Sequence, residues 1–190
     1  MSNKLELRLT GSGGQGLILG GVILAEAAIM EGKKAVQSQS YGPEARGGSS
    51  KAEVIISDEE IDFPKVLKTN LLLTLTQKSC NKYIGSLDSE GILLVDSSVI
   101  VPGTNRAERV VQIPILETAN KVIGKSMVAN IISIGAINGI LHIASKKSLE
   151  AAVLNRVPKG TEDLNKRALE TGYKLVENFN SLKKNCQLVG

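Results

Sequence analysis

Aromatic residues are scarce in this chain of 190 residues, which has three tyrosines, two phenylalanines and no tryptophan. Many proteins that bind single-stranded nucleic acid stack the bases on aromatic side chains, so this composition argues against that class. The formal charge is +4, and the lysine pairs are scattered along the chain rather than gathered in one segment. Scattered lysines are typical of a solvated surface, and we therefore expect no nucleic-acid partner.

Residues that perform chemistry are also few. The two cysteines, Cys80 and Cys186, do not form a Cys-x-x-Cys pair, and two thiolates cannot supply the four that an iron–sulfur cluster normally takes. The only histidine, His142, stands in a predicted apolar helix, where a core or surface role is expected rather than that of a base or metal ligand. Cys80 is interpreted as a small buried residue, because a reactive thiol needs a lowered pKa. Asp96 is open to two interpretations, a general base or a loop cap. The sequence thus predicts a binding module without a catalytic centre or metal site of its own.

Targeting and membrane-spanning segments are not expected. Residues 1–10 alternate apolar and polar residues, unlike a signal peptide, so we expect a cytoplasmic protein. The segment 127–144 is apolar around most of its circumference, but it is shorter than the about 20 apolar residues of a membrane span. It also contains polar residues, namely Asn130, Ser133, Asn138 and His142. We predict a helix buried in the core or against another subunit, in one domain that covers residues 1–190.

The most informative segment is a glycine-rich loop, Gly11-Ser12-Gly13-Gly14-Gln15-Gly16. Alternating leucines before it predict a strand, and the apolar segment 17–30 after it predicts a buried helix. Glycines let a backbone approach a ligand closely, and a helix N-terminus favours an anion. A tight turn without a ligand remains the alternative. The predicted second strand, 34–40, ends without the acidic residue that holds the ribose of NAD, so the pattern favours a phosphate-binding loop over a dinucleotide site.

A second loop, 41–50, contains three glycines, a proline, Tyr41 and Arg46. A plain connection needs neither a tyrosine nor an arginine, and loops at sheet ends often carry binding groups. We therefore favour a binding or interface role, with a simple connection as the alternative.

Strands and helices alternate along the rest of the chain. Strands are predicted at 51–57, 71–75, 92–95 and 110–113, with a turn at 88–91, and helices at 115–122, 127–144, 147–156 and 161–182. This order predicts an α/β fold, a Rossmann-like three-layer domain with a mostly parallel sheet and a helical C-terminal part. The two loops, Thr76-Gln77 and the segment 96–98 should then meet at the carboxyl edge of the sheet, where ligands of open α/β sheets bind.

The glycine-rich loop, combined with Ser40-Tyr41-Gly42-Pro43-Glu44-Ala45-Arg46-Gly47-Gly48, resembles the γ subunit of 2-oxoacid:ferredoxin oxidoreductases. The segment Leu93-Leu94-Val95-Asp96-Ser97-Ser98 fits the same family, and the resemblance covers nearly the whole chain. The amino-acid sequence of residues 39–44 is most similar to that of the 2-oxoglutarate branch, and it is also similar to that of the 2-oxoisovalerate branch.

The resemblance implies a multi-subunit enzyme that decarboxylates a 2-oxoacid, reduces ferredoxin and forms an acyl-CoA. Thiamine diphosphate, Mg²⁺ and [4Fe-4S] clusters are then expected in the partner α, β and δ subunits, and coenzyme A on this chain. We expect the backbone of residues 11–16 to hold the phosphates of coenzyme A. Arg46 should bond a phosphate or a neighbouring subunit, and Tyr41 should line the same edge. The alternatives are a purely structural assembly subunit, a γ subunit of the pyruvate or 2-oxoisovalerate type, and a free-standing oxidoreductase with NAD or flavin.

Overall fold

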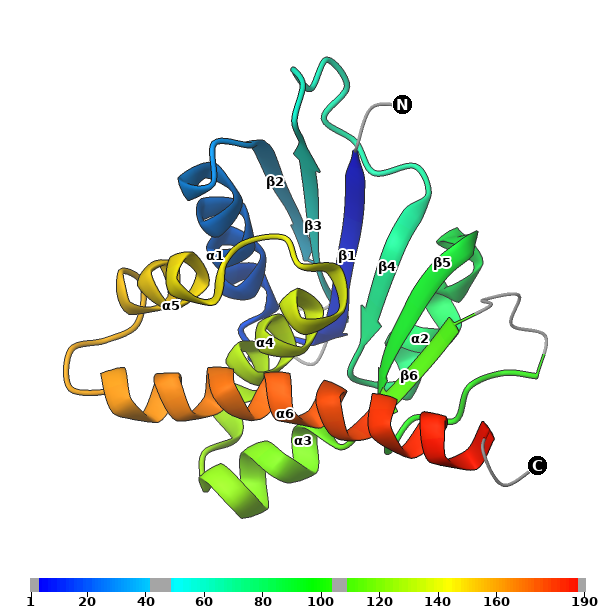
Figure 1. Cartoon of the computed structure of the whole chain (residues 1–190). Coiled ribbons are helices and arrows are strands. Elements are labelled where there is room, and N and C mark those ends of the chain that lie inside the picture. The colour runs from blue at the N-terminus through cyan, green and yellow to red at the C-terminus, as the bar shows by residue number, and fades with distance from the viewer. Residues whose placement is uncertain (1–3, 42–48, 104–108, 188–190) are drawn as a thin grey trace.

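A computed structural model describes residues 4–41, 49–103 and 109–187 of the chain (Figure 1). The strands are β1 (Leu5–Ser12), β2 (Lys34–Tyr41), β3 (Ser49–Ser57), β4 (Thr69–Thr74), β5 (Leu87–Asp96) and β6 (Arg109–Ile113). The α-helices are α1 (Leu17–Met30), α2 (Gln77–Tyr83), α3 (Ile115–Glu117), α4 (Ala129–Leu141), α5 (Lys146–Leu154) and α6 (Glu162–Gln187). Short 3₁₀ turns, η1 (Ile84–Ser86) and η3 (Ser126–Val128), and a π-helical turn, η2 (Thr118–Ile123), complete the described elements.

The described strands form one sheet in the order β2-β3-β1-β4-β5-β6. β1, β4, β5 and β6 pair in parallel, whereas β3 is antiparallel to both of its neighbours, β1 and β2. All strands except β3 therefore point the same way, and their carboxyl ends lie at the lower edge of the sheet in Figure 1. The predicted mostly parallel α/β sheet is confirmed, with one antiparallel strand inserted beside β1.

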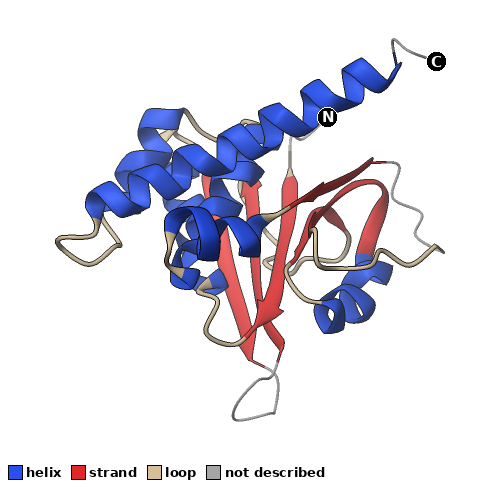
Figure 2. Ribbon diagram, turned by 90° about the horizontal axis from the view of Figure 1, so that it is seen from below, coloured by secondary structure: helices blue, strands red, loops and turns tan. Residues whose placement is uncertain are grey.

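Helices lie on both faces of the sheet (Figure 2). One face packs against α1, α4, α5 and α6, and this main core includes Leu7, Leu9, Leu71 and Leu94 from the strands. The other face carries a smaller cluster under α2, in which Cys80 packs with Leu72, Leu93, Val95 and Val99. Strands β4 and β5 contribute to both clusters, which explains why they are continuous apolar runs rather than alternating ones.

Helix α4 is enclosed on nearly all sides. Every residue from Ala129 to Asn138 is buried, as the all-round apolar sequence predicts. Gly135 and Gly172 lie where α4 crosses α6, and a Cβ on either would collide with the backbone of the other helix. The two helices can therefore approach closely, because each has a glycine at the crossing. We predicted a helix buried either in the core or against another subunit, and the structure shows the core location.

Helix α1 is held by α5 at its C-terminal half. The Glu26 carboxylate accepts a hydrogen bond from Arg156 Nε (2.6 Å), and the Glu31 carboxylate accepts one from the Ser145 N–H (2.9 Å). Hydrogen bonds from Ser148 and Ser145 lower the pKa of Glu31 to about 2. These bonds connect the C-terminal half of α1 to the residues that flank α5.

Two details differ from the sequence-based expectations. The predicted turn at 88–91 is part of β5, where Leu87 pairs with Thr69 but Ile92 pairs with Leu71, so the intervening residues bulge out of the ladder. The helix expected over 127–144 is shorter at both ends, because α4 runs from Ala129 to Leu141. His142 is thus not within a helix but follows it as an exposed residue in the left-handed conformation, with a φ of 51°.

Candidate functional site

The glycine-rich loop follows β1, at the point where the chain changes direction across the sheet. From β1 the chain passes through α1 to β2 and β3 on one side, and then continues with β4 on the other side of β1. Such a switch point leaves a crevice at the carboxyl edge, which is the usual ligand position in open α/β sheets. The loop therefore lies where the sequence predicted.

Internal hydrogen bonds shape the first half of the loop. The Gln15 side chain folds back so that its Oε1 accepts the Ser12 N–H at 2.7 Å. A Cβ at Gly11 would collide with this Oε1 and with the Leu17 side chain. Gly11 and Gln15 thus have a structural role, since they close the turn rather than face outward.

The last glycine of the loop contacts the core helix α4. Gly16 precedes α1 in the left-handed conformation, with a φ of 68°, and its carbonyl accepts a hydrogen bond from Asn130 Nδ2 at 3.1 Å. A Cβ at Gly16 would overlap that same amide. Asn130 is 4% exposed and was not among the predicted site residues. Its signal in the sequence was a polar residue inside an otherwise apolar helix, which we used only as an argument against a membrane span.

The middle of the loop is open. Gly13 and Gly14 are exposed, and a Cβ at Gly14 would meet no atom within 4 Å. Helix α1 begins without a side-chain cap and without an acidic residue in its first turn. The positive end of its dipole and its unpaired N–H groups are therefore neither neutralised nor covered by side chains of α1, an arrangement that favours an anion.

The second predicted loop adjoins the first. Tyr41 ends β2 and pairs with Ser50 of β3, which in turn pairs with Gly11 of β1. With about 4.8 Å between neighbouring strands, the Tyr41 backbone lies about 10 Å from the glycine loop. The side chain of Tyr41 and the whole of Arg46 lie outside the described part of the structure, so their expected roles remain predictions.

Asp96, at the end of β5, is a loop cap. It is 1% exposed, its Oδ1 accepts hydrogen bonds from the N–H and hydroxyl of Ser98, and its Oδ2 accepts one from the Leu116 N–H at 2.8 Å. The carboxylate is thus enclosed by donors of its own chain. Of our two interpretations, the structure supports the cap rather than the general base.

The side chain of Gln77, at the start of α2, also has a structural role. Its Oε1 accepts the Ile100 N–H at 2.8 Å, and its Nε2 donates to the Ile100 carbonyl at 2.9 Å. Gln112 of β6 supports the same segment by donating to the Val99 carbonyl at 2.9 Å. Thr76-Gln77 and Asp96 therefore lie at the predicted edge, but Gln77 and Asp96 hold the loop after β5, and the Thr76 hydroxyl caps α2 by accepting the Ser79 N–H.

The remaining candidates for chemistry show no activation. The Cys80 thiol is buried, and burial raises its pKa above the ordinary value, opposite to what a nucleophile requires. The side chain of Cys186 lies outside the described part of the structure. Within residues 4–41, 49–103 and 109–187, no three His, Cys, Asp or Glu side chains gather as metal ligands, and no helix has the length and apolar character to cross a membrane.

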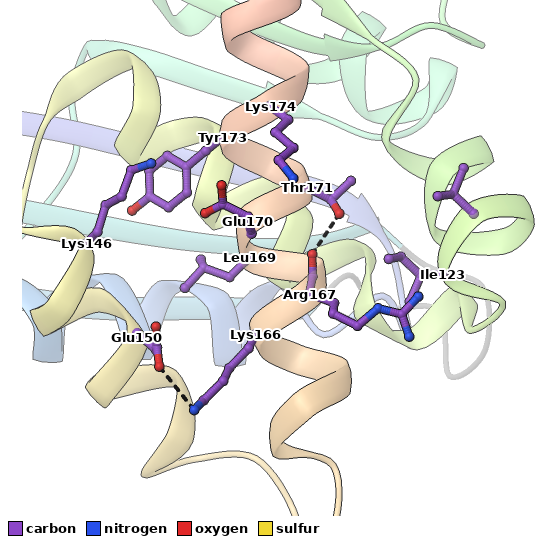
Figure 3. A pocket seen from close by; sticks show the side chains of 11 residues that line it. Ile123, Lys146, Glu150, Lys166, Arg167, Leu169, Glu170, Thr171, Tyr173 and Lys174 are labelled. Atoms are coloured by element: carbon purple, nitrogen blue, oxygen red, sulfur yellow. Dashed lines mark hydrogen bonds and ion pairs between the residues drawn. The ribbon is translucent and has the colours of Figure 1, made fainter.

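A hollow of about 490 Å³ lies elsewhere, between η2, α5 and α6 (Figure 3). Charged side chains of both signs line it: Lys166 pairs with Glu150 at 3.3 Å, and Lys146 lies over the Tyr173 ring at 4.4 Å. None of its lining residues belongs to the glycine loop or hydrogen-bonds to it. We therefore keep the carboxyl edge as the candidate site.

The comparisons with known proteins all indicate the same family. The family model for pyruvate ferredoxin/flavodoxin oxidoreductase matches residues 6–175. The 2-oxoglutarate synthase subunit KorC of Methanocaldococcus jannaschii is 47% identical over 179 residues, which cover 92% of this chain and 95% of that protein.

Solved structures agree. The γ subunit of a keto/oxoacid ferredoxin oxidoreductase from Geobacter sulfurreducens superposes with a TM-score of 0.82 at 44% identity, covering 93% of this chain and 98% of that one. A 2-oxoglutarate:ferredoxin oxidoreductase from Magnetococcus marinus, with 2-oxoglutarate, coenzyme A and succinyl-CoA bound, has a TM-score of 0.82 at 19% identity. This second match covers 92% of this chain but only 31% of that one, so it shows a shared fold. The chain belongs to the pyruvate ferredoxin/flavodoxin oxidoreductase family and is a γ-type subunit of a 2-oxoacid:ferredoxin oxidoreductase.

Proposed function

We propose that this chain is the coenzyme A-binding subunit of an enzyme that converts 2-oxoglutarate and coenzyme A to succinyl-CoA and CO₂, with reduction of ferredoxin. The observation that carries the proposal is the open, uncapped glycine loop at the switch point of the sheet. The 2-oxoglutarate assignment is supported by the names of the KorC relatives, and the coenzyme A assignment by the ligands of the Magnetococcus enzyme.

The four glycines of the loop have different roles. Gly11 and Gly16 are required by neighbouring side chains of the same chain, and Gly14 by its positive φ of 84°. Gly13 is exposed and does not have a positive φ. Its proposed task is to leave the backbone bare, so that the loop N–H groups and the start of α1 receive the phosphates of coenzyme A. Arg46 is proposed to add a charge-assisted bond to a phosphate or to a neighbouring subunit, with Tyr41 at the same edge.

The chain's own residues do no covalent chemistry in this proposal. Thiamine diphosphate, Mg²⁺ and the [4Fe-4S] clusters belong to the partner α, β and δ subunits, where the 2-oxoacid is decarboxylated and electrons leave for ferredoxin. The γ-type subunit binds coenzyme A by its phosphates and directs the thiol toward the partner that holds the thiamine. This division agrees with the buried, unactivated Cys80 and with the Asp96 carboxylate being enclosed by the protein's own donors.

The test is calorimetric titration of the full chain with coenzyme A, before and after Gly13→Val. We expect the valine to cover the bare backbone and to weaken binding by about tenfold or more, since a lost charge-assisted contact to phosphate is worth about 1.5–3 kcal/mol. Gly85→Val is the matched control, because Gly85 is also exposed and a Cβ there would meet no atom within 4 Å. Equal affinity in wild type and Gly13→Val would remove the loop from the site.

A purely structural subunit is the competing function. Exposed apolar side chains flank the same edge, with Ile100 79% and Met127 70% exposed, and such residues suit contact with another subunit. Normal assembly with the partner subunits, combined with no measurable coenzyme A binding by either the chain or the γ site of the complex, would favour this reading.

A further inference from the structure

The hollow between η2, α5 and α6 has no task in the proposed function (Figure 3). Its volume of about 490 Å³ lies within the roughly 300–1,000 Å³ that is usual for binding sites. Helix α6 runs between two groups of lining residues, one toward α5 and one toward η2. The two groups differ in charge, and this difference indicates what the hollow can bind.

The side toward α5 contains both carboxylates that line the hollow. Glu150 pairs with Lys166 at 3.3 Å, and Glu170 projects from α6 toward this side. Lys146 lies over the Tyr173 ring at 4.4 Å. Two acidic and two basic side chains are therefore present here, so this side of the hollow carries little net charge.

Among the lining residues, those toward η2 include two cations and no carboxylate. Arg167 points toward Ile123, and Lys174 lies seven residues further along α6, which is nearly two full turns and therefore on the same face. Both side chains are exposed, and within the described residues neither forms an ion pair or a side-chain hydrogen bond. Glu117, which directly precedes η2, is already paired with Lys121 at 2.9 Å. The positive charge of this side is therefore unmatched.

An apolar surface lies beside these cations. Val122 of η2 is 65% exposed, and Ile123 is partly exposed. A small anion would meet only exposed charges, and ion pairs at an exposed surface contribute little to binding. A polypeptide segment can contact Arg167 and Lys174 together and also cover the apolar side chains, so it gains more from this surface.

We infer that the η2 side of this hollow binds an acidic segment of a partner subunit. At about 1.5 Å per residue, Arg167 and Lys174 are about 10 Å apart along α6, so the segment carries two carboxylates at about that spacing, with an apolar residue between them. Opposite charges across the contact set its orientation and disfavour other partners. The inference rests on this chain being a γ-type subunit, and it does not depend on coenzyme A binding, because the glycine loop is outside the hollow.

The first experiment reverses the charge of this side. The full chain is co-expressed with its partner subunits, and the amount of it that is retained on a tagged partner subunit is measured. We expect Arg167→Glu/Lys174→Glu to reduce this amount about tenfold or more, because attraction at two positions becomes repulsion. Lys65→Glu/Lys68→Glu is the matched control and should be retained like wild type. It makes the same change in charge on two exposed lysines just before β4, outside the hollow. Thermal unfolding of each variant verifies that it is folded.

The second experiment locates the contact. A carbodiimide joins a lysine amine to a nearby carboxylate as an amide, so in the assembled complex it should link Lys174 to an Asp or Glu of a partner subunit. Mass spectrometry of the digested complex identifies this link. Lys174→Arg is the matched control, since it keeps the charge and the assembly but cannot form the amide. Links from Lys174 to its own chain alone, in a fully assembled complex, contradict the inference.

Other outcomes would exclude an acidic partner segment. Equal retention of wild type and Arg167→Glu/Lys174→Glu means that the hollow takes no part in subunit contact, and equal losses in this variant and its control mean a general effect of charge. If inorganic pyrophosphate raises the unfolding temperature of wild type but not of the variant, at unchanged assembly, the occupant is a small anion. If light scattering shows that wild type pairs with a second copy and the variant does not, at unchanged retention, the occupant is that copy.

The affinity of the isolated chain for coenzyme A separates this inference from the proposed function. It should be the same in wild type and in folded Arg167→Glu/Lys174→Glu, because none of the lining residues belongs to the glycine loop. A loss of retention at unchanged coenzyme A affinity supports the docking site. A loss of coenzyme A affinity in the isolated variant would instead assign the two cations to the ligand and overturn the inference.

Discussion

After β5, the carboxyl edge of the sheet is occupied by side chains that bond to their own chain, whereas after β1 it is left to bare backbone. Asp96 and Gln77 together bond Ser98, Ile100 and Leu116, so the loop after β5 is fixed from within. In the loop after β1, the Gln15 side chain accepts one hydrogen bond from the Ser12 N–H, and two exposed glycines, Gly13 and Gly14, lie between these residues. Polar residues at a strand end are therefore weak evidence for a site until their hydrogen-bond partners are known, and unoccupied backbone is the stronger sign.

The largest loss of stability should come from a change in the loop after β5. In Asp96→Ala, three donors that the carboxylate now accepts are left without a partner, and we expect a loss of about 3 kcal/mol in the free energy of unfolding. Chemical denaturation measures this loss, and Asp96→Asn should cost less because the amide keeps one oxygen acceptor. Coenzyme A affinity of the folded Asp96→Ala protein should stay within about twofold. A much greater loss of affinity in a folded variant would place Asp96 in the site after all.

An intermediate loss of stability is expected from Gly16→Ala, in the loop after β1. The left-handed conformation costs a non-glycine residue about 1 kcal/mol, and the new Cβ must also displace Asn130. We expect a total loss of about 2 kcal/mol in unfolding free energy, together with weaker coenzyme A binding.

Gly32→Ala is the matched control for this prediction, because Gly32 has a φ of 80° but a Cβ there would meet no atom within 4 Å. It should show the conformational cost alone and leave coenzyme A binding unchanged. Equal losses in the two variants would mean that Asn130 moves aside freely and does not connect the loop to α4.

The smallest effect should follow Gln77→Ala. Its two bonds to Ile100 lie at the exposed surface, where water replaces them, so we expect a loss of about 0.5–1 kcal/mol. Amide hydrogen exchange should detect faster exchange at Ile100, with no change in coenzyme A affinity. Unchanged exchange at this amide would show that Gln77 does not hold the loop.

Local patterns were enough for much of the fold. Alternating leucines marked β1, and the continuous apolar runs marked β4 and β5 as strands covered on both faces. The all-round apolar sequence of α4 marked a core helix. These predictions succeeded because periodicity records which faces of an element are buried. The bulge at 88–91 and the end of α4 at Leu141 were missed, since turn residues can also occur within an irregular strand and a helix end depends on its neighbours.

Part of the candidate site was beyond local reasoning. Asn130 is a buried polar residue of α4, and nothing in its own segment indicates that its side-chain amide donates to the Gly16 carbonyl. Likewise, the sequence around Asp96 is compatible with both a general base and a loop cap. Only the hydrogen bonds from Ser98 and Leu116 show that it is a cap.

By itself, the sequence determined the strand, glycine turn and helix at the start of the chain, because backbone dihedrals and side-chain periodicity act over a few residues. It also carried the two motifs that indicate the family. Only the tertiary structure decided that β3 pairs antiparallel between β2 and β1, that Asp96 and Gln77 bond the loop after β5, and that Asn130 of α4 bonds Gly16. The physical reason is that strand pairing and hydrogen-bond partners depend on residues far apart in the chain, which no short segment specifies.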